Sequence, residues 1–126
     1  MPPIAARVAE RHLLSAVIPE PEGDLPFLNK QVELLNRLIS RGEERRLGRT
    51  GDIRLQQMWF NGNQVWAKVL GTSDRYDTSI TLRPHPGHQC SCPDWQQNGK
   101  RLGPCKHVLK LGETWLDAVI RKLESM

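Results

Sequence analysis

The sequence has few cysteines and no long apolar segment, and both shortages exclude classes of protein. Its three cysteines cannot all pair, so a disulfide framework does not organise the fold. No apolar run approaches the roughly 18 residues that a membrane-spanning helix needs. The N-terminal residues also lack the basic region and apolar stretch of a secretory signal. We therefore expect a cytoplasmic protein that does not contact a membrane.

Sequence motifs of catalysis are missing as well. No serine stands in the Gly-x-Ser-x-Gly context of a nucleophile elbow, and no glycine-rich loop of the phosphate-binding type is present. We therefore expect no catalytic residues and a protein that is not an enzyme.

The composition is that of one ordinary domain with a basic surplus. The chain has 126 residues, of which 38% are hydrophobic and 25% charged, so it can form a core. Its formal net charge is +4, which permits nucleic-acid binding without requiring it. From Trp95 to Gly112 there is no acidic residue, and the basic residues of this stretch are Lys100, Arg101, Lys106 and Lys110.

Residues 1–52 are expected to form a helical N-terminal extension that acts as an interaction element. Residues 3–18 carry an imperfect helical stripe, and three prolines in residues 19–26 predict an extended linker. Asn29 is then predicted to cap a second helix, which ends at Gly42 or continues to Arg46. The apolar stripe of this helix comprises Val32, Leu35, Leu38 and Ile39.

Two helices of this length bury little by themselves. The stripe must therefore pack on the rest of the chain, on a second copy in a homo-oligomer, or on another partner.

Residues 53–126 are expected to form a second unit that begins with a three-stranded antiparallel meander. Apolar and polar residues alternate from Ile53, and Asn61-Gly62 predicts a hairpin turn with positive φ at both positions. A turn at residues 71–74 leads to a third alternating segment, and residues 83–88 break the sheet. A wide apolar stripe then predicts a C-terminal helix. The core between sheet and helix should contain Tyr76, Ile80, Leu82, Val108, Leu111, Trp115 and Val119.

Cysteine and histidine cluster between the meander and this helix. Cys90 and Cys92 are followed, after a loop of twelve residues, by Cys105 and His107. Three thiolates and one imidazole are the ligand set of a closed tetrahedral zinc site. The first pair ends a predicted strand and the second begins a predicted helix, whose N-terminus favours thiolate. The sequence therefore predicts one structural Zn²⁺ per chain at these four residues.

Two segments carry a resemblance to a known family. Cys90-Ser91-Cys92-Pro93-Asp94-Trp95 and Pro104-Cys105-Lys106-His107-Val108-Leu109 resemble the SWIM zinc finger, and the resemblance extends over about Val65 to Leu116. It implies the same four zinc ligands on a unit of two strands and a helix. It also implies binding to DNA or to protein.

The function expected from the sequence is a DNA-binding module or an accessory factor in DNA transactions. Lys100, Arg101, Lys106 and Lys110 would contact phosphate, or would only offset the charge of the zinc–thiolate cluster. The alternative is a protein-interaction adaptor that recruits a DNA enzyme and binds no nucleic acid itself.

Aromatic and imidazole side chains outside the cluster also offer two interpretations each. Trp95 and Trp115 are expected in the core, whereas Trp59 and Trp66 are expected to be half exposed near the hairpin turn. His85 and His88 are interpreted as a polar loop, with a second metal site as the alternative.

Overall fold

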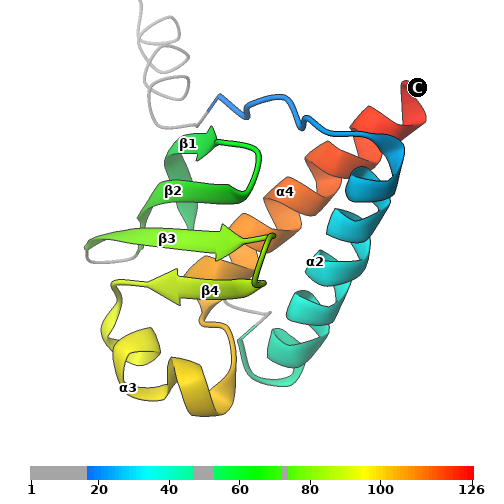
Figure 1. Cartoon of the computed structure of the whole chain (residues 1–126). Coiled ribbons are helices and arrows are strands. Elements are labelled where there is room, and N and C mark those ends of the chain that lie inside the picture. The colour runs from blue at the N-terminus through cyan, green and yellow to red at the C-terminus, as the bar shows by residue number, and fades with distance from the viewer. Residues whose placement is uncertain (1–16, 47–52, 72–73) are drawn as a thin grey trace, which may run out of the picture.

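The computed structural model describes residues 17–46, 53–71 and 74–126. In chain order the elements are helix α2 (Leu25–Arg46), strands β1 (Arg54–Phe60), β2 (Gln64–Leu70), β3 (Arg75–Thr81) and β4 (Gly87–Cys90), and helices α3 (Pro93–Leu102) and α4 (Lys106–Glu124). Helix α4 packs against one face of a single sheet, and α2 lies beside α4 (Figure 1). This confirms the α+β class. No helix within the described ranges is long and apolar enough to cross a membrane.

Helix α2 begins earlier and ends later than its apolar stripe alone indicates. Asp24, not Asn29, is the cap: the backbone N–H of Phe27 donates to Asp24 Oδ1 at 3.0 Å. Pro26 is tolerated because the first turn of a helix needs no donor there. The helix continues through Gly42 to Arg46. A first helix was expected over residues 3–18. Positions 3–16 lie outside the described residues, and Val17 and Ile18 are not helical.

The expected meander is present as β1, β2 and β3, paired antiparallel in that order. Asn61 Oδ1 closes the first hairpin by accepting from the N–H groups of Asn63 and Gln64, both at 2.9 Å. Among the described residues only Gly62 (φ +96°) has a positive φ in this turn, so the expectation of two such positions was wrong. A glycine at the first central position is the pattern of a II′ turn.

The predicted meander and the predicted loop each lacked one element, although the first ligand pair was expected to end a strand. The sheet has a fourth strand, β4, whose residues 87–90 pair with residues 78–81 of β3. The stretch between the two ligand pairs is not only a loop, because α3 occupies most of it. The hydrophobic periodicity of the sequence predicts neither element. Strand β4 has only four residues, and α3 has only a narrow apolar face.

The core lies between the sheet and the two long helices. All seven residues expected there lie in it or, in the case of Tyr76, against it half-buried. Helix α2 adds Leu28 and Leu35, which are fully buried. Trp115 of α4 donates from Nε1 to Oε1 of the buried Gln31 on α2 at 2.9 Å. The apolar stripe of the second helix therefore packs on the same chain. The expected boundary between residues 1–52 and 53–126 stays a prediction.

Candidate metal centre

The first two ligands sit where β4 passes into α3. Cys90 is the last residue of β4 and lies opposite Thr78 of β3, which fixes its position on the inner face of the sheet. Cys92 is the N-cap of α3, and its Sγ accepts a hydrogen bond from the backbone N–H of Trp95 at 3.4 Å. Pro93 then occupies the first helical position, which suits its fixed φ. Both thiols are buried.

The other two ligands sit at the start of α4. Cys105 is its N-cap and is fully buried, and His107 lies in the first turn with 3% of its surface exposed. Gly103 has φ +88°, a backbone conformation that residues with a Cβ rarely adopt, and it turns the chain between α3 and α4. Cys92 and Cys105 are both N-cap residues, so each thiol lies at the positive end of a helix dipole.

The geometry of these four residues fits a zinc ion. One ligand atom from each lies within 4.8 Å of all the others, and His107 Nδ1 is 3.9 Å from Cys105 Sγ. Tetrahedral zinc with bonds of about 2.0–2.3 Å separates its ligand atoms by roughly 3.3–3.8 Å. The cluster needs only a small contraction to reach that arrangement. Among the described residues it is the only group of at least three potential ligands, so His85 and His88 form no second metal site.

The electrostatics of the cluster show why it suits a metal. Hydrogen bonding with Cys105 and Cys92 raises the pKa of the Cys90 thiol far above its ordinary value, while hydrogen bonding with Cys105 and Cys90 lowers the pKa of Cys92. For Cys105, the hydrogen bond with Cys90 lowers the pKa, whereas the hydrogen bond with Cys92 and burial raise it. Together they raise the pKa of Cys105 to about 11. Three buried thiols cannot all ionise side by side without a cation. Zinc supplies that cation and displaces the protons.

His107 is held in place by its neighbours on the sheet. The ring of Tyr76 on β3 packs on the imidazole with centroids 4.8 Å apart. The ring atom Nε2 is buried and has no hydrogen-bond partner in the described part of the chain. A Cβ at Gly71 would come within 3.2 Å of Nε2, so glycine at the end of β2 leaves room for the ring. Neither Tyr76 nor Gly71 was predicted to belong to the site, because the pairing of β2 with β3 brings them there.

The comparison with protein families decides what this cluster is. Residues 86–111 match the family model of the SWIM zinc finger. This segment is a SWIM zinc finger. It contains β4, α3 and the first turns of α4, which is shorter than the expected span of residues 65–116. Its three thiols and one imidazole can bind one zinc ion. No curated protein and no solved structure matched the chain.

The finger is extended by side chains that are not ligands. Trp95 is half-buried on α3, and its Nε1 donates to Nδ1 of His88 on β4 at 2.8 Å, which ties the helix to the edge of the sheet. The sequence assigned His88 to a polar loop, and it lies in a strand instead. A signal for α3 was present in Cys-Pro-Asp, which supplies an N-cap, a first-position proline and an acidic first turn.

The four basic residues of the finger lie on its two helices. Lys106 and Lys110 are half-buried on the first turns of α4. Lys100 and Arg101 fall within α3, but their side chains lie outside the described residues. Their role in binding nucleic acid stays a prediction.

Proposed function

We propose that this protein is a zinc-stabilised module that binds nucleic acid, DNA in the first place, as an accessory factor in DNA transactions. Four protein ligands leave zinc no open coordination position, so the ion acts on structure and we assign the site no catalysis. The need to keep three thiols reduced favours the cytoplasm.

One observation carries this proposal. The two ligand pairs enclose residues 93–104, and a stretch with four basic residues and no acidic one begins inside this segment at Trp95 and continues into α4 as far as Gly112. Structural zinc in small domains contributes roughly 10–16 kcal/mol of apparent binding energy, so it can hold like charges together on one small surface. Such a surface is attractive to a phosphate backbone.

The test measures DNA affinity of the zinc-loaded protein at several salt concentrations. Each neutralised phosphate contributes about one to the slope of log affinity against log salt. Changing Lys100 and Arg101 together to alanine should weaken binding and lower that slope by about two. Lys30→Ala is the matched control, since Lys30 lies on α2 and pairs with Glu33 at 3.5 Å. A salt slope near zero for the unaltered protein would refute the proposal.

A second candidate function, the protein-interaction adaptor, is favoured by one different feature. A cleft of about 210 Å³ lies between α2 and the sheet, and Leu38, Ile80 and Leu82 contribute to its apolar lining. Arg41 and Arg37 stand on its α2 side, and Arg37 already pairs with Glu33 at 2.6 Å. The cleft therefore suits an apolar side chain of a peptide whose acidic residue would pair with Arg41. Binding of such peptides that is lost in Leu38→Glu, together with no affinity for DNA, would establish the adaptor instead.

Self-association through the N-terminal helices is tested by light scattering of the full chain and of a version that starts at Thr50. Because α2 already packs on α4, we propose a monomer whose shortened form is unstable. A full-length dimer that becomes a stable monomer on truncation would establish the homo-oligomer.

A further inference from the structure

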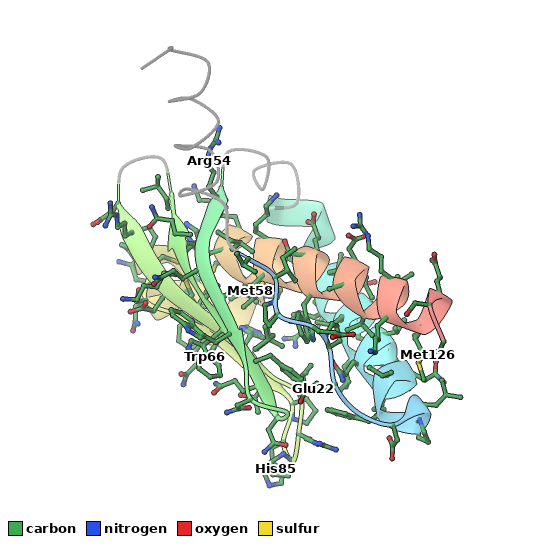
Figure 2. The ribbon with its side chains drawn as sticks, turned by 90° about the horizontal axis from the view of Figure 1, so that it is seen from above. Glu22, Arg54, Met58, Trp66, His85 and Met126 are labelled. Atoms are coloured by element: carbon green, nitrogen blue, oxygen red, sulfur yellow. The ribbon has the colours of Figure 1, made fainter. Side chains whose placement is uncertain are left out.

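The face of the sheet that points away from α2 and α4 is covered by no described helix, and we call it the outer face. Met58 points toward the helices, whereas Trp66 lies on the opposite side of the sheet (Figure 2). Alternation along the paired strands gives the other outer-face positions. They are Arg54, Gln57, Trp59, Gln64, Lys68, Leu70, Arg75, Asp77, Ser79, Thr81, Gly87 and Gln89.

Two tryptophans form a stacked pair on this face. Trp59 and Trp66 lie directly opposite each other on β1 and β2, with ring centroids 5.9 Å apart and planes inclined by 20°. Trp59 is 37% exposed, and Trp66 is half-buried. Large aromatic rings left in water on an open sheet are a ready stacking surface for flat ligands.

An open groove continues from this pair across the sheet. It has a volume of about 650 Å³ and runs between Trp66 and Trp95, with polar side chains such as Gln64, Ser79 and Gln89 along it. The hydrogen bond from Trp95 Nε1 to His88 Nδ1 ties the far wall to β4. The lining also includes Ser91 and the inner-face residue Cys90 at the end of the edge strand β4, so the groove reaches the edge of the sheet beside the zinc finger. A neighbouring groove of about 430 Å³ shares Lys68 and Asp77 with it.

The charge of the outer face favours an anionic occupant. Arg54, Lys68 and Arg75 are exposed there, against a single acidic residue of the strands, Asp77. Lys68 lies opposite Asp77 in register, yet it forms no ion pair with any residue that the structure describes. Its ammonium group is therefore available to a ligand.

We infer that the outer face binds single-stranded nucleic acid, with bases stacked on Trp66 and Trp59 and with phosphates along Lys68 and Arg75. This inference rests on the proposed function and names the form of nucleic acid and the surface that reads it. A duplex hides the faces of its bases, whereas an unpaired strand presents them to aromatic rings. The basic helices of the finger would then extend the path of the same backbone.

The experiment titrates the full-length, zinc-loaded protein with a fluorescently labelled oligothymidylate and with a labelled hairpin duplex. We expect tighter binding of the oligothymidylate and quenching of tryptophan fluorescence. Trp66→Thr, which retains a strand-favouring residue, should weaken binding roughly tenfold, since stacking of one base contributes about 1–3 kcal/mol. Trp66→Phe should retain most of the affinity because a ring remains. Zinc content and melting temperature verify that each variant is folded.

The outcomes separate this inference from the function on which it rests. Binding that prefers the duplex, survives Trp66→Thr and falls in the Lys100/Arg101 variant would overturn the inference and leave the proposed function in place. Absence of binding to either nucleic acid would overturn both. Binding of neutral oligosaccharides to the Trp66 groove with no binding of the oligothymidylate would also overturn the inference, since tryptophan alone would then account for the site.

Discussion

Replacing Gln31 by leucine should destabilise the protein, although it takes a polar side chain out of the core. Gln31 and Trp115 are both fully buried, and Trp115 Nε1 donates to Gln31 Oε1 at 2.9 Å. Leucine leaves that N–H without a partner, at a cost of about 1–3 kcal/mol. Part of this is offset because Gln31 Nε2 is already buried without a described partner. We expect a net loss of about 1 kcal/mol.

A double-mutant cycle isolates the hydrogen bond from the change in packing. Trp115→Phe keeps an aromatic ring but leaves both ends of the Gln31 amide unpaired, so we expect a loss of about 2–4 kcal/mol. The double variant with leucine at position 31 leaves no polar group unpaired there. It should therefore lose less than the sum of the two single changes, with a coupling of roughly 1–2 kcal/mol.

The assay is urea unfolding of the zinc-saturated protein. Asn29→Leu is the matched control, because Asn29 is exposed on the same helix and its replacement should change stability by less than about 0.5 kcal/mol. A Gln31→Leu protein as stable as the original, or a coupling below about 0.5 kcal/mol, would refute the reasoning. Either result would mean that the hydrogen bond between Gln31 and Trp115 contributes little to holding α2 on α4.

The remaining predictions concern the zinc finger and the contact between the two long helices. Cys105→Ser should abolish the single bound zinc and lower the melting temperature, as metal analysis and calorimetry would show; unchanged melting contradicts this. Zinc should be lost as the pH falls, because protons compete with the metal for thiols such as Cys90, whose pKa is raised without metal. A chromophoric chelator detects the released zinc. Zinc retention that does not depend on pH would be contrary evidence. Gly42→Ala should lower the free energy of unfolding by about 1–3 kcal/mol, since the added Cβ would lie 2.5 Å from the buried Leu109. The control is Gly87→Ala, whose added Cβ would meet no atom within 4 Å and should be nearly neutral in the same unfolding assay.

The zinc ligands could be predicted because each pair is local in sequence. Cys90 and Cys92 are separated by one residue, as are Cys105 and His107, and each pair adjoins the end of a regular element. Local spacing and donor chemistry then define the site without knowledge of the sheet. The Tyr76 ring that packs on His107 depends on strand pairing, which spacing along the chain does not encode.

The long strands could be predicted because their alternation is also local in the sequence. The short elements were missed because their sequences hold too few residues to show a pattern. Period-two alternation over seven residues is visible in β3, whereas the four residues of β4 hold a single buried side chain, Cys90. Only its pairing with β3 makes β4 a strand. The start of α2 was misplaced because Pro26 suggests a break, while Asp24 supplies a cap that tolerates proline inside the first turn.

Helix α4 has two separate anchors, and this changes what loss of zinc should do. The ligands hold only its first turn, whereas Leu109 and Trp115 pack it against α2 and the sheet over the turns that follow. Among the side chains of α3 that the structure describes, only the half-buried Trp95 packs against the core, and Trp95 and Gln96 each donate one hydrogen bond to β4. Removing zinc should therefore release α3 and the edge strand β4 first, while α2 and α4 stay together. Zinc then positions the basic segment and one wall of the outer-face groove, rather than holding the whole domain.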